Sequence, residues 1–367
     1  MFYVRMKKKR DDNMANIMEY VTYYGDKTFD EIPFNDIDAL IFTQFCYIEL
    51  DNFLTPKTMP ITIEKLSKSY FLKVKQEDMK HRPKFYRETY DLFDSLKNTK
   101  RYKNIEIHNY QNIIDSEKQF GAMTFRNSKK WAYIAFEGTD TSIIGWKEDF
   151  NLSHQFPIPS QQVAINYLEN EIKFLDKNIY VGGHSKGGNL SLVSVMKSSS
   201  FVRHRVKNIY SFDGPGLREK EYHSLAYKRI QNKIKMFVPS ESIVGMLLNH
   251  DLQYEVVKSS SKGLWQHDPF SWQCFGSVFV KDELSKKSII FSKSIKQFLE
   301  KMPDEERAQF IDVVFTLLDN AGIKNTENLT LSKILKCISG IGDLTEDKKI
   351  KDKLKSIFGI ILDYLKN

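Results

Sequence analysis

The stretch that decides the fold is Ile179-Tyr180-Val181-Gly182-Gly183-His184-Ser185-Lys186-Gly187-Gly188. A short apolar run with good strand formers leads into the pattern G-x-S-x-G, and an apolar helical pattern follows. The turn around the serine is so sharp that the residues two before and two after it must be small, which explains Gly183 and Gly187. This order predicts a nucleophile elbow, with Ser185 at the carboxyl end of a strand and a helix N-terminus directed at it. A simple turn is the alternative, because the short pattern is common.

Strands and helices alternate on both sides of this stretch. We expect strands over 105–107, 120–125, 131–136, 206–212, 235–239 and 254–258, a strand-like run over 270–280, and helices over 161–176 and 218–232. Alternation of this kind predicts an α/β protein with a doubly wound, mostly parallel sheet. Binding sites in such sheets form at the carboxyl ends of the strands.

The chain divides into three parts. Residues 1–13 form a basic tail, 14–282 the α/β domain, and 283–367 a wholly helical region that packs on the body or binds a partner. The domain starts with helical cover over 14–50, and further helices are expected over 59–77, with Thr62 as N-cap, and over 84–99. Segments 217–235 and 243–265 are candidate lid or rim loops by their length.

Composition excludes several classes of protein. The net charge of +8 owes five positive charges to residues 5–10, which we interpret as a solvated tail rather than a nucleic-acid or anionic-lipid site. The cysteines Cys46, Cys274 and Cys337 are scattered, which argues against a zinc site or disulfide framework and fits the cytoplasm. Neither a signal peptide nor a membrane-spanning run is visible.

Ser185 needs a general base, and two histidines follow it in the chain, where an α/β-hydrolase places its base. His267 stands in a loop between Gly263 and Pro269, from which its ring could reach the serine, and His250 is the second candidate. His154 is a weaker candidate. His184, inside the elbow, is expected to point away from the serine and to be structural.

A carboxylate must orient the base, and two positions compete for that role. Asp213 ends the strand after the elbow helix and is followed by a Gly-Pro-Gly turn. Glu241 follows the next strand, and Asp251 and Asp268 are weaker candidates. The alternative role of Asp213 is that of an aspartate that only forms a turn.

The oxyanion of a tetrahedral intermediate needs two donors. The first is the backbone N–H of Lys186, directly after the serine. The second is expected in Gly138-Thr139, which follows the central strand over 131–136. Ordinary turn formation is the alternative for that segment.

Three ordered motifs resemble those of class 3, fungal-type triacylglycerol lipases, over about residues 120 to 280. Phe136-Glu137-Gly138-Thr139 with Trp146 and Asp149 resembles their F-R-G-[ST]…W…D segment, 183–188 resembles G-H-S-L-G-G, and His267 with Trp272 resembles their H…W ending. The chain looks most like an uncharacterised bacterial lipase-like family of α/β-hydrolases. The resemblance implies Ser185 as nucleophile, Thr139 and Lys186 as oxyanion hole, and His267 as base.

Two features depart from that pattern. The place of the lipase acid reads Ser240-Glu241-Ser242, whereas the segment around Asp213 resembles the acid segment of pancreatic-type lipases, so we favour Asp213 over Glu241. Glu137 and Lys186 replace Arg and Leu, and they place a charged pair near the oxyanion hole.

The sequence therefore predicts a cytoplasmic serine hydrolase with the α/β-hydrolase fold, acting on small-molecule or lipid esters without a metal or cofactor. Two alternatives are a catalytically inactive scaffold of the same fold and a module directed at a membrane surface or a partner by its ends. The sequence indicates neither the acyl length of the substrate nor the oligomeric state.

Overall fold

The structure, a computed structural model, describes residues 15–115, 117–128, 130–139, 143–251, 253–323, 332–333, 336–337, 339 and 348–366. The basic tail predicted at 1–13 lies outside the described residues. In the part of the chain that is described, no helix is both long and apolar enough to cross a lipid bilayer.

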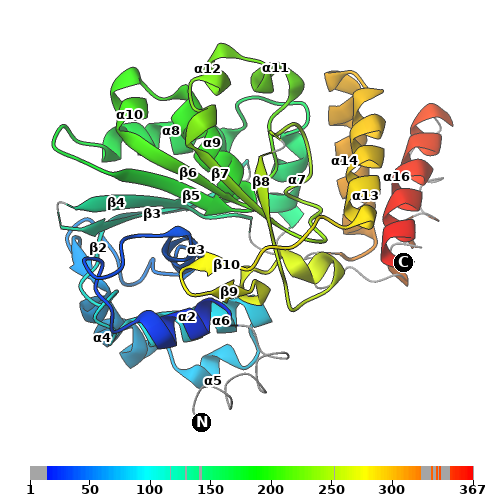
Figure 1. The fold of residues 1–367 in the computed structure, drawn as a ribbon. Helices are drawn as coiled ribbons and strands as arrows, with labels where there is room; N and C mark the ends of the chain where they lie inside the picture. Colours follow the sequence, from blue (N-terminus) through cyan, green and yellow to red (C-terminus); the bar gives the residue numbers. More distant parts are fainter. Residues whose placement is uncertain are drawn as a thin grey trace, which may run out of the picture.

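A single large sheet forms the centre of the molecule (Figure 1). Its strands pair in chain order: β1 (Ile61–Thr62), β2 (Glu106–Ile114), β3 (Gln119–Asn127), β4 (Trp131–Phe136), β5 (Ile179–His184), β6 (Val206–Phe212), β7 (Ile234–Pro239) and β8 (Tyr254–Val257). The pairs from β4 to β8 are parallel, and those from β1 to β4 are antiparallel. The predicted mostly parallel, doubly wound α/β sheet is thus confirmed.

Helices cover both faces of the sheet (Figure 1). One face carries α2 (Ile17–Tyr24), α3 (Asp36–Phe45), α4 (Ile63–Lys73), α5 (Gln76–Met79) and α6 (Lys84–Leu96), the predicted N-terminal cover. The other face carries α8 (Pro159–Glu171), α9 (Lys186–Lys197), α10 (Ser200–Arg205), α11 (Glu219–Tyr222) and α12 (Leu225–Lys228). The helices on each face bury an apolar cluster against the sheet. Because β4, β5 and β6 are enclosed on both faces, their sequences are apolar runs.

Two predicted elements differ from the structure. The helix expected over 218–232 is broken into α11, α12 and a 3₁₀ turn, η1 (Gln231–Lys233), because Ser224 accepts the N–H of Tyr227 and starts a new helix. The run over 270–280 holds a 3₁₀ turn, η3 (Pro269–Ser271), and a short hairpin of β9 (Cys274–Phe275) and β10 (Val278–Phe279). Phe270, Trp272 and Phe279 of this run are buried, whereas Phe275 is exposed, and the intervening turns prevent their β propensity from producing one long strand.

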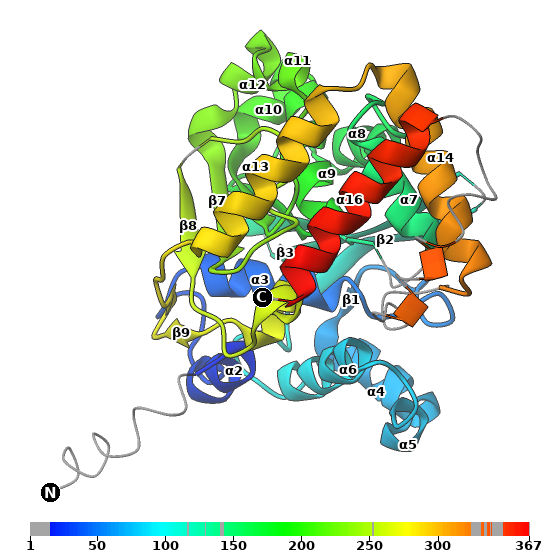
Figure 2. The same ribbon diagram turned by 90° about the vertical axis from the view of Figure 1, so that its right-hand side faces the viewer.

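The C-terminal helices pack against the body formed by the sheet and its helices (Figure 2). They are α13 (Lys286–Glu300), α14 (Asp304–Asn320) and α16 (Lys348–Lys366). α14 lies beside α7 (Ile143–Asn151), and α16 packs against α13 and α14. The ring of Phe315 lies 5.5 Å from that of Phe150, and the buried hydroxyl of Ser288 donates to the carbonyl of Ser242. These contacts favour packing on the body over the free partner-binding alternative.

A buried ion pair between Arg101 and Asp38 holds together the segments of the N-terminal cover. The guanidinium of Arg101 donates to Asp38 with Nε–Oδ1 at 2.8 Å, and both side chains are 0% exposed. Further N–H groups of Arg101 donate to backbone carbonyls of the segment before α3, such as Ile32 at 2.9 Å. Because every charge here is hydrogen-bonded, the desolvation cost of the pair is offset.

We predict that Arg101→Met lowers the free energy of unfolding by about 3–5 kcal/mol, because it leaves the Asp38 carboxylate buried without its partner. Urea denaturation followed by circular dichroism measures the loss. Lys130→Met, which breaks the solvent-exposed pair with Asp30, is the control and should cost at most about 1 kcal/mol. Equal losses in the two variants would contradict the prediction.

Candidate active site

Ser185 occupies the junction between β5 and α9 in a strained backbone conformation. Its φ is 57° and its ψ is −129°, a region that costs an L-residue of order 1–3 kcal/mol. The turn is held by the N–H of Ser185, which donates to the carbonyl of Phe212 on β6 at 3.0 Å. A Cβ on Gly183 would lie 2.2 Å from the carbonyl carbon of Gly187, so the sharp predicted turn needs glycine. This geometry is that of a nucleophile elbow.

The side chains of Asp213 and His267 meet beside this turn. Nδ1 of His267 lies 2.6 Å from Oδ2 of Asp213, and a carboxylate there favours the tautomer with hydrogen on Nδ1. Asp213 directly follows β6, and Ser185 directly follows the parallel neighbour β5, so the side chains of these two residues emerge at the same edge of the sheet. The carboxylate is 1% exposed, whereas the imidazole is 31% exposed.

The other oxygen of Asp213 is also anchored. Oδ1 accepts the hydroxyl of Ser242 and, at 3.1 Å, the N–H of Gly245. Ser242 stands near the place where class 3 lipases carry their acid, and here it supports a carboxylate that comes from the preceding strand. The carboxylate therefore has hydrogen bonds on both oxygens and a fixed direction toward His267.

Glu241 has a different place from the one that the competing prediction gave it. Its carboxylate accepts the N–H of Gly263, and its own N–H donates to Oε1 of Gln266 at 2.9 Å. Trp272, fully buried, donates from Nε1 to the carbonyl of Gln266 at 2.8 Å. Glu241 thus helps to hold the loop that carries His267, and among the described residues no hydrogen bond joins Glu241 to that imidazole.

The serine and the imidazole are near each other but not hydrogen-bonded. The ring of His267 lies 4.4 Å from that of His184, the residue directly before Ser185. Among the described residues, no hydrogen bond joins Oγ of Ser185 to His267. Bonds between catalytic groups are often long in the absence of substrate and tighten when it binds.

The predicted oxyanion segment lies against the serine. A Cβ built on Gly138 would stand 3.2 Å from Cβ of Ser185, which shows how closely this backbone approaches. The next residue, Thr139, donates its hydroxyl to Oδ2 of Asp149 on α7 at 2.7 Å. Lys186 opens α9, where backbone N–H groups of the first turn have no partner within the helix.

We expected a charged pair of Glu137 and Lys186, and this expectation is wrong, because the acidic partner of Lys186 is Glu148. Nζ of Lys186 lies 2.9 Å from Oε2 of Glu148 and donates to the carbonyl of Gln119 at 2.8 Å. The side chains of the pair are 0% and 2% exposed, so the lysine points into the protein and not into the substrate mouth. The other oxygen of Glu148 accepts the N–H of Ser160 at 3.0 Å.

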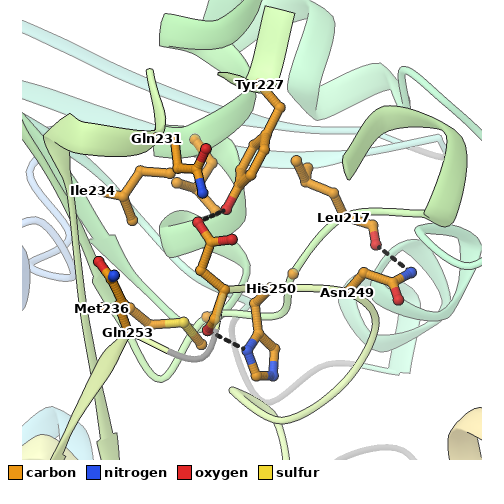
Figure 3. Close-up of a pocket in the computed structure, with 12 residues that line it drawn as sticks. Leu217, Tyr227, Gln231, Ile234, Met236, Asn249, His250 and Gln253 are labelled. Atoms are coloured by element: carbon orange, nitrogen blue, oxygen red, sulfur yellow. Dashed lines mark hydrogen bonds between the residues drawn. The ribbon is translucent and has the colours of Figure 1, made fainter. Parts of the chain in front are cut away.

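Other predicted candidates lie elsewhere. His250 lines a separate cavity of about 30 Å³, shown in Figure 3, where Nδ1 lies 3.0 Å from the carbonyl of Asp251. That volume suits about one water molecule and not an ester. Asp251 accepts the hydroxyls of Tyr222 and Tyr227, and Asp268 pairs with Lys84. Among the described residues, no cluster of three or more His, Cys, Asp or Glu side chains could hold a metal ion.

Three residues that surround the site could not be singled out from the sequence. Glu148 gives no signal of its own, although it precedes the Asp149 of the lipase-like motif. Gln266 precedes His267 and carries no chemistry that would single it out. Tyr47 lies more than a hundred residues before the elbow, and its hydroxyl, 3.1 Å from Nδ1 of His184, follows from the tertiary fold alone.

Two of three comparisons with known proteins find a similar protein or family. A family model described as Mbeg1-like matches residues 96–316, more than half of the chain. Among solved structures, the chain is similar to the crystal structure of M37 lipase, with 16% sequence identity and a TM-score of 0.35 over 57% of this chain and 69% of that chain. The search among curated proteins finds no match.

The carboxyl group of Asp149 is expected to make the stability of the fold depend on pH. Burial, partly opposed by Lys186 and by the hydroxyl of Thr139, raises the pKa of its carboxyl to about 6 from an ordinary 3.8. The folded state therefore binds a proton more readily than the unfolded state. The resulting stabilisation is complete below about pH 4 and is lost as the pH rises through about 6, by about 1.4 kcal/mol for each unit of pKa difference.

We predict that Asp149→Asn removes this dependence, so that the difference in unfolding free energy between wild type and variant changes between pH 4 and pH 7. Urea titrations across that range measure the difference. Asp26→Asn, at an exposed carboxyl, is the control for the loss of a carboxylate at the surface. A difference for Asp149→Asn that does not change with pH would refute the account of its burial.

Proposed function

The chain belongs to the lipase-like family described as Mbeg1-like, and we propose that it is a serine hydrolase that cleaves carboxylic esters. One observation carries the proposal: the 2.6 Å contact between His267 and Asp213 lies beside a serine held in the strained turn of a nucleophile elbow. A strained serine and an oriented imidazole together are the parts that nucleophilic acyl transfer requires.

The proposed reaction starts when Oγ of Ser185 attacks the ester carbonyl and Nε2 of His267 takes its proton. The backbone N–H groups of Lys186 and Thr139 stabilise the oxyanion. The tetrahedral intermediate collapses as the imidazolium protonates the leaving alcohol, and an acyl-enzyme remains on Ser185. Water, deprotonated by His267, then attacks the acyl carbonyl, and the imidazolium returns the proton to Oγ of Ser185 as the carboxylic acid leaves. Asp213 holds the tautomer of the imidazole and stabilises its positive form.

We further propose that the domain extends over 14–282, that residues 283–367 form its helical appendage, and that the substrate is a small-molecule or lipid ester in the cytoplasm. The three cysteines are free and buried, which suits a reducing compartment.

The missing hydrogen bond between Ser185 and His267 is the observation that favours the second candidate, an inactive scaffold with the same fold.

We predict that a fluorophosphonate probe labels the folded protein and that Ser185→Ala abolishes the adduct, because only an activated serine reacts rapidly. Mass spectrometry of the intact protein and of its peptides locates the adduct. Ser194→Ala, which removes another buried hydroxyl of α9, is the control and should be labelled like the wild type. Absence of any Ser185-dependent adduct would leave the scaffold as the better account.

We predict that substitutions of the two candidate acids, Asp213 and Glu241, have different effects on kcat. Asp213→Asn should lower kcat on a p-nitrophenyl ester by up to about 10⁴-fold, because the amide no longer selects the reactive tautomer of His267. Glu241→Gln should stay within a few-fold of the wild type, because the amide oxygen can still accept the N–H of Gly263. The reverse order would assign the acid to Glu241.

A further inference from the structure

Two buried side chains outside the proposed triad connect its parts. Tyr47 follows α3, in the N-terminal cover, and is 4% exposed. His184 is the last residue of β5, directly before Ser185, and is also 4% exposed. Neither side chain has a role in the reaction proposed above, yet burying a phenol and an imidazole is costly unless both are hydrogen-bonded.

Their hydrogen bonds form one continuous chain. The N–H of Gly138 donates to the hydroxyl oxygen of Tyr47 at 2.9 Å. That oxygen lies 3.1 Å from Nδ1 of His184. Nε2 of the same ring lies 2.8 Å from the backbone carbonyl oxygen of His267. The chain therefore runs from the oxyanion segment, through the residue before the nucleophile, to the residue proposed as base.

Only one set of proton positions satisfies every link. The carbonyl of His267 can only accept, so Nε2 of His184 carries hydrogen. Burial, reinforced by the neighbouring His267, lowers the pKa of the His184 imidazole well below its usual value, so the ring is neutral. Nδ1 is then an acceptor, and the hydroxyl of Tyr47 donates to it while accepting from Gly138.

We propose that Tyr47 and His184 are positioning residues, which hold the oxyanion segment at Gly138 and the base loop at His267 in place around Ser185. This inference rests on the proposed function and adds a role for a residue of the N-terminal cover. The fit is tight, because a Cβ on Gly138 would stand 2.3 Å from the Tyr47 hydroxyl and 2.5 Å from the carbonyl oxygen of His184.

The reason to expect a kinetic effect is geometric. The backbone of Gly138 precedes the proposed donor Thr139, and the anchored carbonyl belongs to the proposed base itself. Misplacement of a reacting group by about 1 Å can cost about 10²-fold in rate. Loss of the Tyr47 hydroxyl would leave the N–H of Gly138 without this acceptor and would release Nδ1 of His184, so that the ring holding the His267 carbonyl would be fixed at one nitrogen only. Substrate binding remote from these atoms would be unaffected.

The test compares two buried tyrosines. Tyr47→Phe should lower kcat on a short-chain ester by about tenfold to a hundredfold with KM within about twofold of the wild type. Tyr133→Phe is the matched control, because it removes a buried hydroxyl that contacts Thr43 at 2.6 Å away from the chain, and it should keep the wild-type kcat. Equal losses in both variants, or none in Tyr47→Phe, would overturn the proposal.

A second pair of variants tests the link to His267. Gln at position 184 keeps an N–H donor for the His267 carbonyl, whereas Leu removes it. We expect His184→Gln to retain at least about tenfold more kcat than His184→Leu when both are folded by circular dichroism. Equal activity of the two folded variants would overturn the positioning role of His184.

A readout that needs no activity separates this inference from the proposed function. In protein labelled with ¹⁵N-histidine, NMR should show a neutral His184 with hydrogen on Nε2 at pH 7, assigned by the loss of its signals in His184→Gln. A charged ring, or hydrogen on Nδ1, would overturn the inference even in an active enzyme. A wild type that neither hydrolyses esters nor reacts with the fluorophosphonate would refute the proposed function and with it any catalytic purpose of the chain, whatever the tautomer.

Discussion

The constraint on which the site depends is the sharp turn between β5 and α9. Ser185 has a backbone conformation that L-residues rarely adopt, and a free energy of order 1–3 kcal/mol must come from the surroundings to hold it there. The bond from its N–H to Phe212 and the contact of the two elbow glycines supply part of that support. Since β6 is the parallel neighbour of β5, the same bond fixes where Asp213 emerges relative to the serine.

Buried polar contacts also fix the segments around the turn relative to one another. Lys186 pairs with Glu148 on α7, and the adjacent Asp149 accepts the hydroxyl of Thr139, so the elbow helix and the oxyanion segment share one support. Both ions are desolvated, and such pairs are poor sources of stability compared with apolar packing. We interpret this pair as fixing the relative positions of two segments rather than as a major contribution to the free energy of folding.

The sequence could predict what depends on local pattern. The apolar run before Gly183 and the small residues around Ser185 indicated the elbow, and alternation of strands and helices indicated the sheet whose edge gathers Asp213 and His267. Partners that the tertiary fold brings together could not be predicted. Glu137 and Lys186 were expected to place a charged pair near the oxyanion hole, because they replace Arg and Leu of the lipase-like motifs. The lysine side chain instead reaches Glu148, and Tyr47 belongs to a segment without any motif.

The most direct measurement is a crystal structure of the protein after reaction with a phosphonate ester. The account predicts phosphorus bonded to Oγ of Ser185, with a phosphonyl oxygen within hydrogen-bond distance of the backbone N–H of Lys186 and of a donor of Thr139. It also predicts the His267 ring, still paired with Asp213, close to the position of the leaving group. An adduct on another residue, or a His267 ring turned away from the phosphonate, would contradict the account.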